Sequence, residues 1–157
     1  DVGNLTVYCT SGSGTMSLTH GYRQGGRISG TKQDIIERFA FSSDGDAVDV
    51  GNLTAVVSNC GNNGQNSSTH GYAAGGETDF LKIQKYQFAA SSNATIVGTL
   101  NSPNRSATGG NSSTTHGYTS GSPTINNIDK WSFTSDGNSS DVGDLTLARQ
   151  SMASCSS

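Results

Sequence analysis

The residues best suited to chemistry in this chain are three histidines, His20, His70 and His116, each in a Thr-His-Gly-Tyr tetrapeptide. Neutral imidazole binds metal ions, and protonated imidazole binds anions. Equivalent histidines around an axis could therefore form a ring of ligands. No carboxylate or cysteine recurs beside them, and regular recurrence is typical of a structural residue. We expect each histidine to bond a neighbouring backbone group, and we expect no metal or other cofactor.

A second set of possible ligands is the acidic cluster Asp44, Asp46 and Asp49, which Asp136 and Asp141 partly repeat. Carboxylate oxygens suit a hard cation such as Ca²⁺. The spacing is less dense than in a calcium-binding loop, and Asp and Asn also form turns through their own side chains. We expect these residues to form turns.

No arrangement of residues indicates catalysis. The segment Gly12-Ser13-Gly14 lies in a polar stretch and predicts a turn rather than a nucleophile elbow. The pairs Gly25-Gly26 and Gly109-Gly110 do not open a helix, so they offer no dipole for a phosphate. We expect a protein that is not an enzyme.

The three cysteines, Cys9, Cys60 and Cys155, have no metal-binding spacing and stand at different places in the repeat described below. Their odd number leaves at least one free thiol. We expect small, buried or half-buried side chains rather than a disulfide framework. The chain begins at Asp1 rather than Met, which favours a processed protein or a piece of a longer one.

The composition of the 157 residues is poor in charge, with 31% hydrophobic residues, 13% charged residues and 21 glycines. The net charge is −3 and the basic residues are scattered, so we expect no nucleic-acid partner. No apolar run approaches the roughly 18 residues of a membrane span, so we expect no membrane insertion. Such a composition is typical of secreted and virion β-proteins, and it predicts a virion or extracellular location.

The histidine motifs belong to an internal repeat that runs through the chain. Its opening motif, Asp-Val-Gly-Asn-Leu-Thr, stands at residues 1–6 and 49–54, with related copies at 97–100 and 141–146. An Ile-x-x-aromatic-x-Phe segment follows each histidine motif, at residues 36–41, 83–88 and 128–133. Phe41 and Phe88 are 47 residues apart, and Phe88 and Phe133 are 45 apart. We therefore divide the chain into repeats of about 1–48, 49–95 and 96–140, plus an extra opening strand at 141–157.

Each repeat predicts short strands separated by turns. The opening motif leads into a strand with Leu5 and Val7 as its apolar positions, and the histidine motif forms a second strand. In the third strand, Phe39 and Phe41 lie on one face by period two, and Ile36 faces the other way. No segment shows sustained helical periodicity, so an all-β fold is expected.

Aromatic residues recur at three further positions of the repeat. Phe39, Tyr86 and Trp131 are either packed between repeats or exposed as platforms for sugars, and we favour packing because large rings bury the most area. The tyrosine beside each glycine can be buried with its hydroxyl on a backbone partner. The expected structural positions are thus the three histidines together with Tyr22, Tyr72, Tyr118, Phe39, Tyr86, Trp131, Phe41, Phe88 and Phe133. Ligand-contacting residues are left unassigned.

The repeat resembles the kelch repeat, with a double glycine at Gly25-Gly26, an aromatic at Phe39, and Leu145, Thr146 and Arg149 in the last copy. Its longer strings resemble repeats of virion structural proteins of marine cyanophages, over essentially the whole chain. These resemblances imply blades of a β-propeller in a virion or tail-appendage protein.

Three repeats are too few for a ring, which takes about four to eight blades. The chain is then part of a longer propeller, or other chains complete it. Both ends carry the same motif and would compete for one position, which argues against a simple six-bladed dimer. The alternative fold is an open stacked β-repeat array or fibre.

The function expected is that of a non-enzymatic virion structural or tail-appendage protein, which acts by assembly and host-surface binding. Its partners would be other virion proteins, copies of itself or a host glycan. The loops Gln24–Lys32, Gly76–Phe80 and Ser120–Asn126 would carry specificity. The alternative is a secreted or cell-surface lectin with one shallow sugar site in each repeat.

Overall fold

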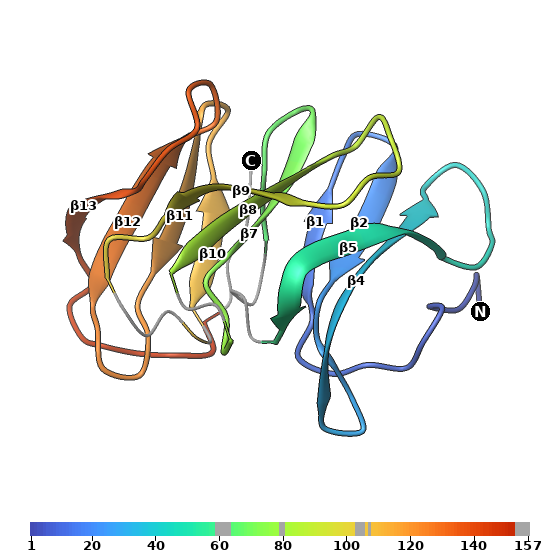
Figure 1. The fold of residues 1–157 in the computed structure, drawn as a ribbon, viewed down its shortest axis with the longest axis horizontal. Helices are drawn as coiled ribbons and strands as arrows, with labels where there is room; N and C mark the ends of the chain where they lie inside the picture. The colour runs from blue at the N-terminus through green and yellow to red at the C-terminus, as the bar shows by residue number, and fades with distance from the viewer. Residues whose placement is uncertain (59–63, 79–80, 103–105, 107, 153–157) are drawn as a thin grey trace.

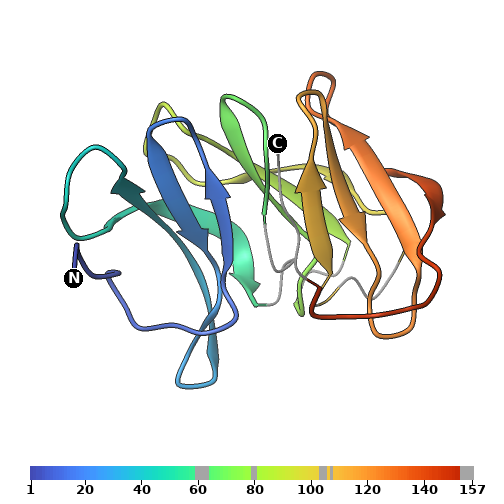
Figure 2. The same cartoon turned by 180° about the vertical axis from the view of Figure 1, so that it is seen from behind.

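The computed structural model describes residues 1–58, 64–78, 81–102, 106 and 108–152. These residues contain strands and turns and no helix, so the all-β prediction is confirmed. Three antiparallel sheets stand side by side in chain order (Figure 1), and the view from behind shows the same succession (Figure 2). The strands are β1 Ser13–Met16, β2 His20–Gln24, β3 Arg27–Ile28, β4 Thr31–Ala40, β5 Val48–Val57, β6 Gln65–Asn66, β7 His70–Ala74, β8 Lys82–Gln87, β9 Thr95–Thr99, β10 Gly109–Ser112, β11 His116–Ser120, β12 Asn127–Ser132 and β13 Ser140–Asp144.

Each sheet is a meander in which sequential strands pair. The order is β1-β2-β4-β5 in the first sheet, with β3 also paired to β4. The second sheet is β6-β7-β8-β9, and the third is β10-β11-β12-β13. The register repeats as well, since His20 is opposite Ala40, His70 opposite Gln87 and His116 opposite Ser132.

The last strand of each sheet, β5, β9 or β13, contains the opening motif of the following sequence repeat. Residues 49–54 lie in β5 and residues 141–144 in β13, so each sheet begins later in the chain than the sequence repeat does. The first copy, residues 1–6, forms no strand. The strand predicted around Leu5 and Val7 is therefore wrong, because this segment bonds to the turn before β5, where the N–H groups of Gly45 and Ala47 donate to the carbonyls of Val2 and Asn4.

The first strands of the three sheets, β1, β6 and β10, were not predicted from the sequence. Residues 12–14 were expected to form a turn, but Ser13 and Gly14 pair with Gln24 and Arg23 in β1. Gly109 and Gly110 likewise lie in β10, opposite Ser120 and Thr119. Glycine has low strand propensity, and here pairing with the next strand overrides that preference.

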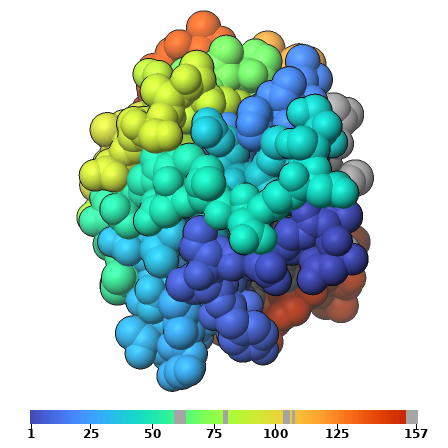
Figure 3. All heavy atoms as spheres, turned by 90° about the vertical axis from the view of Figure 1, so that its right-hand side faces the viewer, coloured from blue at the N-terminus to red at the C-terminus, as the bar shows by residue number. Residues whose placement is uncertain are grey.

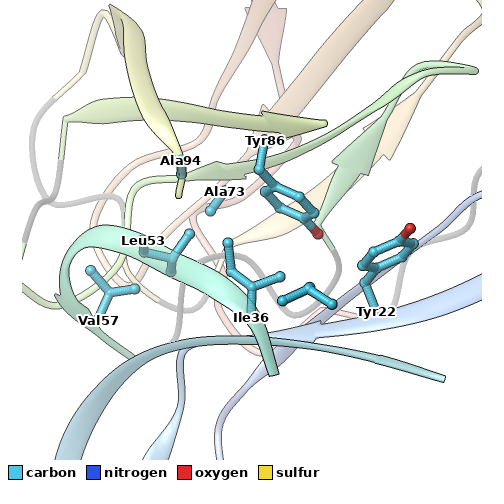
Figure 4. Close-up of a cluster of buried hydrophobic side chains, with 8 residues drawn as sticks. Tyr22, Ile36, Leu53, Val57, Ala73, Tyr86 and Ala94 are labelled. Carbon is cyan, nitrogen blue, oxygen red and sulfur yellow. The ribbon is translucent and has the colours of Figure 1, made fainter. Parts of the chain in front are cut away.

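The hydrophobic core lies between the sheets. One cluster joins Tyr22, Ile36 and Leu53 of the first sheet to Ala73 and Tyr86 of the second (Figure 4). A second cluster joins Tyr72, Ile83 and Leu100 of the second sheet to Trp131 of the third. The two faces of the middle sheet thus contribute to different clusters, as period-two alternation requires.

The glycine of each Thr-His-Gly-Tyr motif makes room for an aromatic ring on the adjacent strand. Gly21, Gly71 and Gly117 are paired with Phe39, Tyr86 and Trp131. A Cβ atom on Gly71 would lie 2.4 Å from the ring of Tyr86, and one on Gly117 would lie 2.4 Å from the ring of Trp131. The motif therefore pairs glycine with the aromatic position of the repeat.

We expect Gly71→Ala to lower the free energy of unfolding by about 1–3 kcal/mol, because the added methyl group would displace the buried ring of Tyr86. Gly14→Ala is the matched control, since the nearest atom to its Cβ position is 3.7 Å away. Urea unfolding followed by circular dichroism measures both variants. Equal stability of the two would contradict the packing role of Gly71.

Candidate functional site

The three histidines occupy equivalent places directly after the turn of the first hairpin of each sheet. The ring Nδ1 of His20 lies 2.8 Å from Oγ1 of Thr19, and the same distance separates His70 from Thr69. His116 and Thr115 repeat this contact at 2.8 Å. Each imidazole thus contacts the side chain before it, whereas the sequence analysis expected a backbone group.

Serine hydroxyls complete these hairpins. The backbone N–H of His20 donates to Oγ of Ser17 at 3.0 Å, and that of His70 donates to Ser67 at 3.1 Å. His116 and Ser113 repeat the bond at 3.1 Å. Burial and the charge of Lys85 lower the pKa of His70, and Asp136 acts in the opposite direction.

Three of the acidic residues considered as calcium ligands, Asp46, Asp49 and Asp141, accept backbone hydrogen bonds. Oδ1 of Asp49 accepts the N–H of Gly51 at 3.0 Å, and Oδ1 of Asp46 accepts the N–H of Asn4 at 2.8 Å. In the described part of the chain, no three His, Cys, Asp or Glu side chains are grouped to hold a metal ion. Cys9 is a free, half-buried thiol, and Cys60 and Cys155 lie outside the described residues.

The aromatic positions form stacks between neighbouring sheets. Tyr22 of the first sheet stacks on Phe88 of the second, with ring centroids 4.7 Å apart. Tyr72 of the second sheet stacks on Phe133 of the third, also at 4.7 Å. The hydroxyl of Tyr22 donates to the carbonyl of Phe88 at 3.2 Å, which is the backbone partner expected for this tyrosine.

The exposure of the remaining aromatic side chains depends on which of the three sheets they belong to. Tyr86 is 3% exposed and Trp131 is 2% exposed, because the preceding sheet covers each of them. Phe39 is 39% exposed and Phe41 is 53% exposed, at the side of the first sheet where no sheet of the described residues precedes it. Tyr118, at the other end of the array, is only half-buried.

The threonine of the opening motif links neighbouring sheets through two hydrogen bonds. The backbone N–H of Thr54, in the first sheet, donates to Oε1 of Gln84 in the second sheet at 2.7 Å. The Thr54 hydroxyl donates to the same oxygen at 2.8 Å. Thr6 makes both bonds to Glu37, with its backbone N–H at 2.6 Å. Residues 1–6 therefore bind the first sheet as β5 binds the second.

Asx side chains near the following turn make a second link. The N–H of Asn52 donates to Oδ1 of Asn93 at 3.0 Å, and that of Thr99 donates to Asn138 at 3.0 Å. The turns also bond the motif directly, since Gly45 donates to the carbonyl of Val2 at 2.7 Å. Three sheets thus carry the same receiving surface for an opening motif.

The glycine of the opening motif permits this close approach. A Cβ atom on Gly3 would lie 2.1 Å from the carbonyl oxygen of Gly45. On Gly51 it would lie 2.4 Å from that of Ser92, and on Gly98 it would lie 2.0 Å from that of Gly137. Any side chain larger than hydrogen would separate the motif from its turn.

The acceptor positions Glu37, Gln84 and Asp129 were missed by the sequence analysis. They follow the recurring isoleucine directly and are each fully buried. Their common place in the repeat was the available signal, but their different charges concealed the common role. In the first sheet Nε of Arg23 lies 2.7 Å from Oε2 of Glu37, which balances the buried charge.

The cross-strand partner of the acceptor differs between the first two sheets. Arg23 stands opposite Glu37, whereas Ala73 stands opposite the neutral Gln84. The ion pair in the first sheet is thus replaced by an uncharged pair in the second, without loss of the link to the opening motif.

The loops expected to carry specificity are partly joined to each other. Arg27, in the loop of the first sheet, forms an ion pair with Glu77 in the loop of the second. Nζ of Lys32 lies 3.6 Å from the same carboxylate. Residues 79 and 80 of the second loop lie outside the described residues.

No known protein-family description and no curated protein sequence matches this chain. The described residues include no helix of the length and hydrophobicity needed to cross a membrane. The candidate functional site is the repeated surface between sheets. Each sheet binds an opening motif through its buried acceptor and presents the next opening motif in its last strand.

We expect Glu37→Gln alone to destabilise the fold by about 3–5 kcal/mol, because it leaves the guanidinium of Arg23 buried without its carboxylate. The double variant Arg23→Ala with Glu37→Gln reproduces the pair found in the second sheet, and it should recover most of that loss. A double-mutant cycle from urea unfolding measures the coupling. Additive effects of the two substitutions would contradict the compensation.

We expect stability to fall between about pH 10 and pH 12 through Tyr72. Burial, followed by the charge of Asp136, raises the pKa of Tyr72 to about 12. The stabilisation is complete below the unfolded-state pKa of about 10 and is lost as pH rises through the folded-state value. Unfolding curves of Tyr72→Phe should lack this part of the decline. An identical decline in the variant and the parent chain would rule out Tyr72 as its source.

Proposed function

We propose that this chain is a non-enzymatic structural protein of a virion or tail appendage, which acts by assembly and by binding to a host surface. The observation that carries the proposal is the repeated binding surface between sheets. This surface joins each sheet to the next, and between the first and second sheets the bond runs from Thr54 to Gln84. The low charge and the resemblance to phage virion repeats favour this setting.

We further propose that the sheets are blades of a β-propeller. The second and third sheets are four-stranded meanders, the first has a fifth strand, and β6 of the second sheet contacts both β1 and β10. The N–H of Gly64, before β6, donates to the carbonyl of Gly14 in β1 at 2.9 Å. The N–H of Asn66 in β6 donates to Oγ of Ser112 in β10 at 2.9 Å. Contacts between inner strands are what a ring around an axis requires, and an open stacked array is the alternative arrangement.

The second candidate function is sugar binding by a lectin-like protein. A hollow of about 410 Å³ beside Phe39 and Phe41 favours it, because an exposed aromatic pair near Asp44 offers stacking and a hydrogen-bond acceptor. Tyr86 and Trp131, at the position of Phe39 in the other two sheets, are buried, so the exposed aromatic pair occurs in the first sheet alone. A lectin with a site in each repeat needs an exposed aromatic residue in every sheet.

Density-gradient fractionation of the source material tests the virion proposal, with the chain followed by peptide mass spectrometry. We expect its peptides to co-migrate with DNA-filled particles, because a structural component remains attached to the particle. A control protein of the host cytosol should stay at the top of the gradient. Recovery of the chain only in the soluble or cell-surface fraction would overturn the proposal and favour the lectin.

A further inference from the structure

We propose that the chain assembles head to tail with a second copy of itself, and that residues 1–6 compete for the binding site. This inference rests on the proposed assembly function and names its partner. The last opening motif, residues 141–146, would bind the first sheet of the second copy. It would occupy the place that residues 1–6 take in Figure 3, where they lie on the open face of the first sheet beside the turn that precedes β5.

The segment that would bind the second copy is the last opening motif, residues 141–146, which begins in β13. Gly143 has a φ of +152°, close to the +149° of Gly3 and Gly51. Those two glycines face a carbonyl of a turn, whereas the Cβ position of Gly143 has no atom within 4 Å. Val142 is 52% exposed, whereas Val50 at the same motif position is buried. Among the described residues, the third sheet therefore presents a complete opening motif whose glycine meets no turn of a neighbouring sheet.

The surface that would receive it lies on the first sheet. Phe41 and Phe39 stand in the positions of Phe88 and Tyr86, against which Tyr22 packs in the interior of the array. The hollow beside Phe41 is therefore the place for an equivalent tyrosine. Tyr118 holds that position in the third sheet and is half-buried there.

Residues 1–6 partly occupy this site within the chain. Thr6 uses the acceptor Glu37, and the N–H of Asn4 uses Asp46. Their apolar residues Val2 and Leu5 line the hollow but leave it open. Residues 1–6 thus take the hydrogen bonds of the site and leave its aromatic part without a stacking tyrosine.

One substitution distinguishes the competing motifs. They share Asp-Val-Gly-x-Leu-Thr, with Asn4 in the first and Asp144 in the last. The Asn4 side chain donates from Nδ2 to Oδ1 of Asp46 at 3.2 Å. Asp144 would bring a carboxylate to the same atom, so a hydrogen bond would become a contact between like charges. Residue 144 therefore weakens the exchange and keeps assembly reversible.

The test compares the full chain with Asp144→Asn by sedimentation velocity across a concentration series. We expect the variant to associate about tenfold more tightly, the order expected from one hydrogen bond regained and one exposed like-charge contact removed. Asp34→Asn, on β4, is the charge-matched control and should behave like the parent chain. An Asp144→Asn chain that stays monomeric at every concentration would overturn the proposal.

A complementation experiment in the Asp144→Asn background establishes the direction of the contact. Val142→Asp blocks the inserting end, and Phe41→Asp blocks the receiving surface. Both side chains are exposed, so we expect both variants to fold. Each alone should be monomeric, and their mixture should form a dimer with one copy of each, because one intact interface remains.

Self-association of either blocked variant would show a different interface and contradict the proposal. A monomeric mixture that instead binds a glycan through Phe41 would assign the hollow to sugar. If the mixture stays monomeric while the parent chain co-migrates with particles, the self-assembly inference fails and the proposed virion function stands.

Discussion

The structure depends on the opening motif that leaves one sheet and bonds to the next. In a repeat protein each unit buries its apolar surface against its neighbours, and here the middle sheet contributes residues to a cluster on each side. Thr54 reaches the buried amide of Gln84, and Leu53 is buried in the same interface. The link combines satisfied hydrogen bonds with apolar burial, so adjacent sheets stabilise each other.

The composition follows from this arrangement. Each interface brings backbone close to backbone and places a ring over a glycine, so the sequence needs many glycines and few long charged side chains. Serine and threonine hydroxyls bond the hairpins at Ser17 and its equivalents, which replaces the salt bridges of a more charged surface. The ion pair of Arg23 and Glu37 is buried, and its replacement by Ala73 and Gln84 indicates that the link requires an acceptor rather than a charge.

Equivalent aromatic residues differ in burial between the first sheet and the two sheets that follow it. Tyr86 and Trp131 are buried because a sheet precedes each of them, whereas Phe39, at the same position of the repeat, is exposed. The same positions of the repeat are thus buried where a sheet precedes them and exposed in the first sheet. The proposed assembly function uses this exposed aromatic surface.

Local sequence was enough to predict the all-β class, the period of the repeat and the strands around Phe39, Tyr86 and Trp131, because hydrophobic and aromatic residues recur there at regular positions. It did not reveal the innermost strand at Ser13, since glycine and serine carry little local preference for a strand. Only the tertiary structure showed that Glu37, Gln84 and Asp129 share one role and that Phe39 differs in burial from its equivalents. Burial and pairing depend on which sheet lies alongside, and local sequence does not contain that information.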